Sequence, residues 1–304
     1  MKTAKKRMVN LMKLTNRRLT SVALGYFDGV HLGHQAVLKA ALNTEYEPAV
    51  LTFRGKFKGN LNINNYRFEM IKSLGIDPYQ TYTYRLSDIK NLEPEEFVLK
   101  TLLGELNAKI VCCGYDFRFG KGGWAGADEL TKLCNKFGME TIIVPPVEVD
   151  GVPVNSTFIR QLIAEGDIKK ANKFLGYEHF YMGYVVGGNK LGRTIGFPTI
   201  NQEFPLFCVV PRFGVYSSRV SIGVYKDGGF KEEQVYDGIT NIGVKPTAGS
   251  HNNVTIETHI VGYDGDLYDE LVKVSLVDFI RPERKFDSFE ELKKQIDEDL
   301  KWLK

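Results

Sequence analysis

Two histidines in a glycine-rich stretch are the side chains of this sequence best suited to act on a phosphate group. His31 and His34 lie within Gly25–His34, between a short apolar run and a stretch with helical spacing. The free N–H groups at a helix start attract a phosphate, and glycines let the backbone approach it closely. Imidazole donors there could stabilise a phosphoryl group as it becomes five-coordinate, which requires no protein nucleophile. The alternative is two surface histidines in a turn, and the strand–glycine–helix context favours the phosphate site.

Two further stretches of the first half offer groups for a nucleotide. Asn155–Arg160 places hydroxyls at a predicted helix start, with Ser156 as the expected cap. Arg160, about one turn later, could reach a triphosphate. The simpler alternative is a cap followed by an amphipathic helix. Gly114–Gly123 follows a buried apolar run, and its aromatic and glycine residues could hold a planar ring. Such loops are common after strands, so this one alone is weak evidence.

The second half contains groups suited to a metal–nucleotide complex. Thr199 and Asn201 both offer oxygen atoms, and alternate residues of an extended segment face the same side. They could share Mg²⁺ with the phosphates of ATP, because Mg²⁺ takes few protein ligands and keeps several waters. Glu257 lies on the polar face of a predicted strand, beside His259, where it could accept a hydroxyl proton. The alternatives are a hairpin turn with a solvated charge at Gly187–Lys190 and a solvated strand face at Glu257.

The elements that must position the first group of residues alternate between strand and helix. Apolar runs predict strands at Ser21–Leu24, Ala49–Phe53, Ile110–Cys113 and Ile142–Val144. Helical spacing predicts helices at His34–Leu42, Pro94–Leu106 and Ala127–Phe137, and two more that end at Gly166 and Gly176. This alternation predicts a parallel sheet covered by helices, with ligands at the carboxyl ends of the strands.

The chain reads differently from Phe180 onward. Short runs rich in Val, Ile, Tyr and Thr are separated by Gly, Asn, Asp and Pro, and Val254–Ile260 alternates between apolar and polar side chains. This pattern predicts an antiparallel sheet or a small barrel. Ser288 and Glu291 have capping-box spacing before an apolar stripe, which predicts a terminal helix. The change of pattern predicts two domains, residues 1–178 and 179–304.

Composition and charge exclude several classes of protein. Of the 304 residues, 43% are hydrophobic and 25% are charged, which is typical of a soluble protein with well-packed cores. The formal net charge of only +3 argues against binding to nucleic acid through a large excess of positive charge. No apolar run is long enough to span a bilayer, and no apolar signal-peptide core follows the basic start. The four cysteines form no C-x-x-C pair, so we expect a reduced chain in the cytoplasm.

The stretches of the first half, taken in order, resemble one family. G-Y-F-D-G-V-H-L-G-H, G-Y-D-F-R-F-G and N-S-T-F-I-R are similar to motifs in the adenylyltransferase half of bacterial bifunctional riboflavin kinase/FAD synthetases. The resemblance implies a Rossmann-like nucleotidyltransferase domain in which His31, His34 and Arg160 handle the phosphates of ATP. It also implies that Asp116 and Phe117 help to hold the flavin. The sequence departs from the family at Arg54–Lys56, where a P-H-P segment is usual, and at Asn155, where Ser is common.

The second half resembles the riboflavin kinase half of the same family. It carries G-x-V-x-x-G-x-x-x-G-R, G-F-P-T-x-N, N-I-G-x-x-P-T, E-x-H and R-P-E-x-K-F-x-S in order. The resemblance implies a small kinase barrel in which Thr199 and Asn201 hold Mg²⁺, Glu257 is the base and Arg281 lies near the flavin or a closing loop. Departures are Gly187 for His, Asn189 for Asp, and Asp269 for Gly. The residues predicted to bind nucleotide in the two halves are Gly25, Phe27, Asp28, Gly33, Ser156, Thr157, Gly187, Gly188 and Lys190.

The sequence therefore predicts two consecutive reactions. The barrel would phosphorylate riboflavin with MgATP to give FMN, and the α/β domain would join FMN to AMP from a second ATP to give FAD and pyrophosphate. The expected partners are riboflavin, FMN, FAD and ATP, with neither nucleic acid nor membrane. One alternative retains only the kinase activity. The other is a protein that binds flavin or nucleotide as a sensor, and the retained His31, His34, Arg160 and Glu257 speak against it.

Overall fold

The computed structural model describes residues 18–54, 59–61, 64–188, 191–226, 229–244 and 254–303. Gly55, Lys56, Asn189 and Lys190 lie outside these ranges, as do Lys245–Thr247, the last residues of the N-I-G-x-x-P-T motif. The chain forms two compact units, which are described one at a time: Met1–Lys56 with Met70–Pro153, and Phe57–Glu69 with Val154–Lys304. These two units are defined by which residues pack together. The predicted boundary after residue 178 separates two functions instead, and it stays a prediction.

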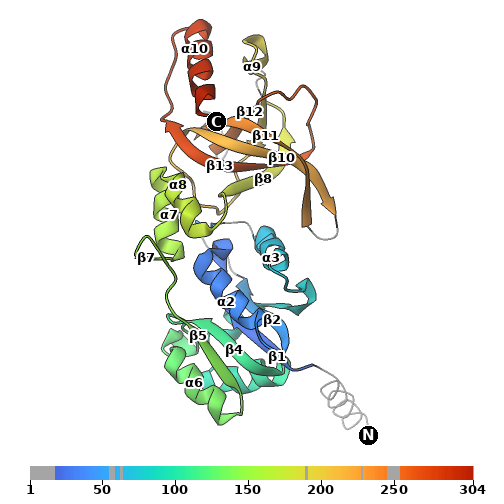
Figure 1. The fold of residues 1–304 in the computed structure, drawn as a ribbon, viewed down its shortest axis with the longest axis vertical. Coiled ribbons are helices and arrows are strands. Elements are labelled where there is room, and N and C mark those ends of the chain that lie inside the picture. Colours follow the sequence, from blue (N-terminus) through green and yellow to red (C-terminus); the bar gives the residue numbers. More distant parts are fainter. Residues whose placement is uncertain are drawn as a thin grey trace. The chain divides into compact units, whose positions relative to one another are not determined.

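A five-stranded sheet forms the centre of the first unit (Figure 1). Its order is β3-β2-β1-β4-β5, with β1 (Thr20–Leu24), β2 (Glu47–Arg54), β3 (Thr81–Arg85), β4 (Ala108–Gly114) and β5 (Glu140–Val144). All neighbouring strands are parallel, which confirms the predicted sheet. The chain moves outward from β1 in one direction and from β4 in the other, so the switch point of the sheet lies between these two strands.

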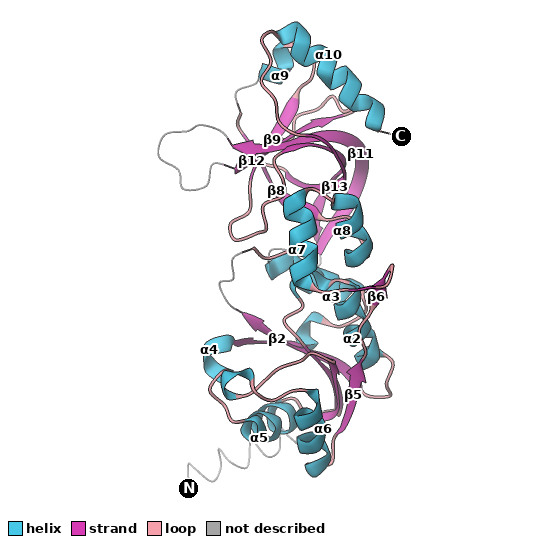
Figure 2. Cartoon of the chain, turned by 90° about the vertical axis from the view of Figure 1, so that its left-hand side faces the viewer, coloured by secondary structure: helices cyan, strands magenta, loops and turns pink. Residues whose placement is uncertain are grey.

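Helices cover both faces of this sheet (Figure 2). One face packs against α2 (Leu32–Leu42) and the end of α3 (Asn64–Ser73). The other face packs against α6 (Ala127–Lys136) and the helical segment that follows α5 (Pro94–Glu96). Residues of β1 alternate between the two cores, with Val22 and Leu24 in one and Ala23 in the other. The strands are thus apolar on both sides, as buried parallel strands are. Two short elements complete the unit, α4 (Leu86–Ile89) and the hairpin of β6 (Glu148–Val149) and β7 (Val152–Pro153).

The predicted helix Pro94–Leu106 differs from an α-helix over most of its length. Only Pro94–Glu96 is α-helical, and Phe97–Glu105 is a π-helix. Its last bond runs from the Leu106 N–H to the Thr101 carbonyl, five residues back, at 3.0 Å. The apolar spacing of one short helix does not distinguish this wider turn from the usual one, so the sequence predicted a helix without its type.

A closed six-stranded antiparallel barrel forms the centre of the second unit (Figure 1). Its strands are β8 (Phe180–Val186), β9 (Thr199–Glu203), β10 (Gly214–Lys226), β11 (Gly229–Val244), β12 (Val254–Ile260) and β13 (Leu271–Arg281). The order around the barrel is β10-β11-β12-β9-β8-β13. Along β12, Ile256, Thr258 and Ile260 are buried, whereas Glu257 and His259 are only partly covered. The predicted alternation of this strand is therefore confirmed.

Four helices accompany the barrel: α7 (Ser156–Glu165), α8 (Ile168–Leu175), α9 (Leu191–Thr194) and α10 (Phe289–Asp299). The prediction of Ser156 as the cap of α7 is wrong. Asn155 is the cap, because its side-chain oxygen accepts the Phe158 N–H at 2.8 Å. Gly166 and Gly176 end α7 and α8 in the left-handed conformation that glycine adopts readily, as predicted. Ser288 caps α10, and that prediction is confirmed.

His179 is buried where α8 leads into the barrel. Its ring is fully covered, packs edge-on against Tyr181 at 5.0 Å, and has no hydrogen-bond partner on either nitrogen among the described residues. Its backbone is well anchored, since its N–H donates to the Asn172 Oδ1 and its carbonyl accepts the Leu276 N–H. Burial lowers the pKa of His179 from 6.5 to about 4, because the charged imidazolium would lose its hydration.

This histidine should make the barrel less stable in mild acid. The folded state binds the proton less readily than the unfolded chain, so the stabilisation is complete above pH 6.5 and is lost as the pH falls toward 4. The loss at pH 5 should be about 2 kcal/mol of unfolding free energy. Urea unfolding of the wild type and of His179→Leu at pH 7 and pH 5 tests this. The difference between the two proteins should shift by that amount, and a difference independent of pH would contradict a buried neutral ring.

Two further features concern the cysteines and the length of the helices. All four cysteines are buried and none forms a disulfide, and burial raises the pKa of Cys113 to about 12, which makes its thiol unreactive. Within the described ranges, no helix combines the length and the apolar character needed to cross a bilayer.

Candidate functional site

The loop after β1 adopts a strained conformation at the switch point of the parallel sheet. Phe27, Gly29 and Val30 all have positive φ, at 54°, 74° and 36°. This is unusual for a β-branched residue such as Val30, and backbone strain of this kind is often found at functional sites. Phe27 is fully buried, and its ring lies within 3.1 Å of where a side chain on Gly25 would begin. Gly25 therefore leaves room for the aromatic side chain that shapes the loop.

The two histidines lie together at the start of α2. His31 is the cap of this helix, and its Nδ1 accepts the His34 N–H at 3.3 Å. An acceptor at Nδ1 places the proton of a neutral His31 ring on Nε2, which makes that atom a donor. The two imidazoles stack with centroids 3.6 Å apart, and Phe27 packs edge-on against His34. The predicted pair thus forms one unit at a helix N-terminus, where negative charge is stabilised.

The loop after β4 lies at the same end of the sheet. β1 and β4 are adjacent and parallel, so Gly25, directly after β1, and Gly114, the last residue of β4, lie at carboxyl ends on either side of the switch point. Gly114 lies close to Asp116, because a side chain on this glycine would begin 3.0 Å from the Asp116 Oδ1. Asp116 is exposed, and Phe117 stacks on Phe119. Phe117 also packs against the core on one side of the sheet, so neighbouring side chains fix its ring.

The third predicted stretch lies in the second unit, on the first turns of α7. Ser156 and Thr157 are its first two residues, at the end where N–H groups are available to an anion. Arg160 is partly buried, and its Nε donates to the Gly59 carbonyl at 2.7 Å. Gly59, which is distant from Arg160 in the sequence, thus fixes the direction of the guanidinium group through this bond.

A row of polar side chains crosses three strands of the barrel. Asn201 on β9, Glu257 on β12 and Asn241 on β11 are direct cross-strand partners. Such partners have their side chains on the same face, with Cβ atoms about 5 Å apart. Thr199 and His259 form the neighbouring pair of the same two strands. The predicted metal ligands and the predicted base are therefore next to one another, and Asn241 is a neighbour for which the sequence suggested no role.

A cavity of about 300 Å³ opens beside Glu257 and Asn241 of this row, and Asn201 is not among its lining residues. Thr199, Glu257 and Asn241 line it from the strands, and α10 contributes Phe289 and Ile296. Asn241 donates to the Glu283 Oε1 at 3.2 Å, so Glu283 belongs to the same wall. The lining of the cavity is divided almost equally between apolar, aromatic or glycine residues and polar or charged ones, so the cavity offers both apolar surface for a ring and groups for polar contacts.

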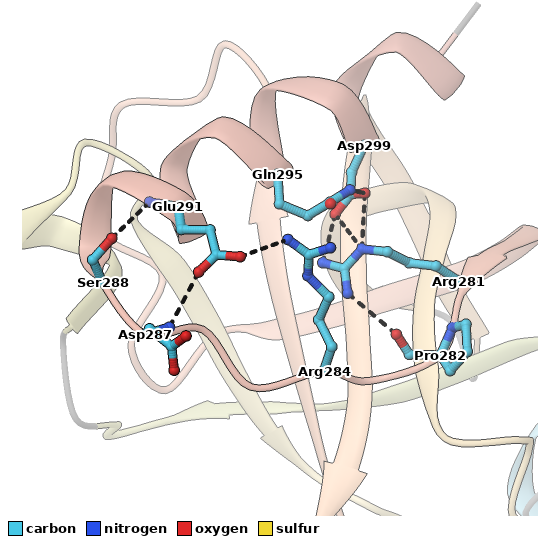
Figure 3. A network of polar contacts seen from close by, with 8 residues as sticks. All are labelled: Arg281, Pro282, Arg284, Asp287, Ser288, Glu291, Gln295 and Asp299. Atoms are coloured by element: carbon cyan, nitrogen blue, oxygen red, sulfur yellow. Dashed lines mark hydrogen bonds and ion pairs between the residues drawn. The ribbon is translucent and has the colours of Figure 1, made fainter.

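Arg281 holds the terminal helix against the barrel (Figure 3). Its Nε and Nη2 donate to both carboxylate oxygens of Asp299 at 2.8–3.1 Å, and Gln295 donates to the same carboxylate. Asp299 is 1% exposed, so this is a buried ion pair with good hydrogen bonds. Arg281 also lines the 300 Å³ cavity, but its guanidinium is bound to Asp299. Its flavin role stays a prediction, and its contact with α10 is a structural role that the sequence analysis missed.

A second cavity of about 480 Å³ shares one residue with the first. Thr199 lines both, and Arg193, Asp264 and Tyr268 are among the other lining residues. Asp269, where the family usually has glycine, has φ 64°, a left-handed conformation that Asp tolerates better than most residues. Gly187 and Gly188 follow directly after β8. A side chain on Gly188 would displace the Asn201 amide, so glycine at this position leaves that side chain in place.

The donor atoms on β9 fit Mg²⁺ rather than a softer metal. Thr199 and Asn201 provide neutral oxygens on one face of the strand, and Glu257 adds a carboxylate next to Asn201. No three His, Cys, Asp or Glu side chains of the described residues come together as a metal site. A cation here would therefore complete its ligands with water and nucleotide phosphates, as Mg²⁺ commonly does.

The two folds with these sites define a class: enzymes that pair a parallel α/β nucleotide-binding domain with an antiparallel barrel. Comparison with known families agrees with this class. The FAD synthetase family matches residues 13–158, and the riboflavin kinase family matches residues 175–304. Bifunctional riboflavin kinase/FMN adenylyltransferases of Listeria monocytogenes and Bacillus subtilis are each 32% identical to this chain. Each match covers 91% of this chain and 89% of the relative.

A solved structure also matches nearly the whole chain. The crystal structure of a Streptococcus pneumoniae protein described as a macrolide-efflux protein has a TM-score of 0.82. It is 32% identical, and the match covers 93% of both chains. The chain therefore belongs to the bifunctional riboflavin kinase/FMN adenylyltransferase family.

Proposed function

We propose that this chain makes FMN from riboflavin and ATP in its barrel, and FAD from FMN and a second ATP in its adenylyltransferase half. The observation that best supports the proposal is that Glu257 and Thr199, assigned separately as base and metal ligand, line one cavity. Four buried cysteines that form no disulfide suit a reducing compartment, and we place the enzyme in the cytoplasm.

In the kinase reaction, Glu257 accepts the proton of the ribityl 5′-hydroxyl. The hydroxyl oxygen bonds to the γ-phosphorus of ATP, the bond to the β-phosphate oxygen breaks, and ADP leaves. Thr199 and Asn201 would hold Mg²⁺, whose chemistry is to neutralise the charge of the phosphates. The 300 Å³ cavity takes the flavin, with Phe289 and Ile296 against the ring system. Gly187, Gly188 and Lys190 contribute to the nucleotide site.

In the adenylyl reaction, an oxygen of the FMN phosphate bonds to the α-phosphorus of ATP, and pyrophosphate leaves. The Nε2–H of His31 and the ring of His34 stabilise the charge that develops on the five-coordinate phosphorus. Gly25, Phe27, Asp28 and Gly33 form the loop that binds the nucleotide. Ser156, Thr157 and Arg160 bind its phosphates, and Asp116 and Phe117 hold the flavin.

Removing the Thr199 hydroxyl should weaken the metal–nucleotide complex of the kinase. We expect Thr199→Ala to reduce MgADP affinity by roughly 10-fold or more, since even indirect partners of a metal contribute this much. Isothermal titration with MgADP measures the effect. Thr255→Ala, on β12 opposite Glu203 and outside both cavities, is the matched control. Equal affinities for the two variants would remove Thr199 from the site.

One reaction distinguishes the proposal from its alternatives. The protein is incubated with riboflavin and MgATP, and the flavins are separated by chromatography. A bifunctional enzyme gives FMN first and FAD later, whereas a kinase without adenylyl transfer stops at FMN. A protein that only binds flavin or nucleotide leaves riboflavin unchanged.

A further inference from the structure

Asn60 packs with the unit that contains the barrel, although its sequence belongs to the adenylyltransferase half. Asn60 forms a parallel bridge with Cys208, in the linker between β9 and β10. The Asn60 N–H donates to the Phe207 carbonyl at 2.8 Å, and the Val209 N–H donates to the Asn60 carbonyl at 2.9 Å. The compact unit that contains the barrel accordingly includes residues 57–69.

The same linker also holds α7. The Arg212 N–H donates to the Ile163 carbonyl at 3.3 Å, near the end of that helix. The Arg212 side chain packs against Gly166, where an added Cβ would lie 3.1 Å from the Arg212 Cδ. Residues 207–212, called the clamp below, therefore contact both the Gly59–Asn60 segment and α7.

Arg160 connects the two elements that the clamp holds. It extends from α7, and its Nε donates to the Gly59 carbonyl at 2.7 Å. The stem of Arg160 also runs past Gly59, since a side chain there would begin 3.9 Å from its Cδ. This bond uses the Nε–H and fixes the orientation of the planar guanidinium, the group that would meet a triphosphate.

Two details indicate that the surroundings impose the clamp geometry. Asn60 is 7% exposed, and its Oδ1 has no hydrogen-bond partner among the described residues. Phe207, whose carbonyl accepts the Asn60 N–H, has φ 67°, which is costly for a bulky residue. Neither an unpaired buried amide oxygen nor a left-handed Phe persists unless neighbouring contacts hold it.

We propose that the clamp positions Arg160 for adenylyl transfer, with Gly59 and Asn60 as positioning residues. The linker of the kinase barrel would thus be a structural part of the adenylyltransferase. This inference rests on the proposed role of Arg160 in binding the ATP phosphates. A small misplacement of such a group is expected to cost up to about 100-fold in rate.

The test removes one clamp bond from the barrel side. Val209→Pro deletes the N–H that donates to Asn60 and keeps the carbonyl that accepts the Tyr181 hydroxyl. We expect FAD synthesis from supplied FMN to slow by about 10- to 100-fold, and riboflavin phosphorylation to stay near the wild-type rate. Val210→Pro is the matched control, because Val210 is exposed and its N–H donates to no group in the described ranges.

A reversible cross-link provides the second readout. Asn60→Cys places a thiol opposite Cys208, at the strand spacing of about 4.8 Å that a disulfide can span. In the Val209→Pro background, oxidation should restore FAD synthesis and dithiothreitol should remove the gain. In the otherwise wild-type chain, the oxidised Asn60→Cys variant should keep its FAD synthesis rate. If Val209→Pro also loses kinase activity, the proposed role of the clamp is judged from this cross-linked variant instead.

Three results would overturn the inference. They are wild-type FAD synthesis by Val209→Pro, failure of the cross-link to form, and loss of FAD synthesis on cross-linking that a reductant reverses. Each leaves the proposed function intact, provided that the wild-type chain converts FMN to FAD. Absence of that conversion in the wild type would instead contradict the proposed function.

Discussion

Replacing Glu257 with glutamine is expected to slow riboflavin phosphorylation by roughly 10²–10⁴-fold, the usual cost of losing a general base. Glutamine has nearly the same shape and can still face Asn201 and Asn241, but it cannot accept the ribityl proton. FAD synthesis from supplied FMN should continue at the wild-type rate. The measurement is the initial rate of FMN formation from riboflavin and MgATP, with FAD synthesis assayed separately.

The matched control for this variant is Glu203→Gln. Glu203 is an exposed carboxylate on β9, paired with Thr255 and absent from the lining of both cavities. The Glu203→Gln variant should retain full kinase activity. If Glu257→Gln phosphorylated riboflavin as fast as this control, the row of polar side chains would have another role and the base would have to be sought elsewhere.

Replacing either histidine of the glycine-rich loop should slow FAD synthesis by roughly 10²–10³-fold in kcat, the cost of removing one donor aimed at a transition-state charge. His31→Asn is a demanding test because asparagine also caps helices well, so α2 should keep its N-terminus. His34→Gln retains a polar side chain beside Phe27. The apparent affinity for ATP should change little, because the charge that these donors meet develops in the transition state.

The kinase activity of the same variants shows whether the chain has folded. Riboflavin phosphorylation depends on the barrel and should be unchanged in both. If His31→Asn and His34→Gln both converted FMN to FAD at the wild-type rate, the stacked pair would be a structural feature of the loop.

Local patterns were sufficient to predict most of the fold. Apolar runs identified four strands of the parallel sheet, and alternation along Val254–Ile260 identified a barrel strand with Glu257 on its outer side. β3 was missed because Thr81–Arg85 is short, polar and only partly buried. Its place at the sheet edge depends on pairing with β2, which a local pattern does not contain.

The parts of the site that were missed depend on contacts between residues distant in sequence. Asp299 lies three residues after Ile296 on the apolar face of α10, and a carboxylate at that position is a signal that a buried cation faces it. Its partner, Arg281, could not be identified without the packing of α10 on β13. The bond from Arg160 to Gly59 spans 101 residues and has no signature in either stretch.

The most direct test of two separate active sites in one chain is a mixing experiment with Glu257→Gln and His34→Gln. Each variant alone, given riboflavin and MgATP, should produce almost no FAD. Glu257→Gln lacks FMN to convert, whereas His34→Gln makes FMN but transfers the adenylyl group too slowly, so that FMN accumulates. The mixture should produce FAD, because FMN released by the His34 variant is a substrate for the Glu257 variant. A mixture that forms no FAD, while each variant keeps its remaining activity, would contradict independent sites that exchange free FMN. Loss of both activities in either variant would contradict the assignment of these residues to separate halves.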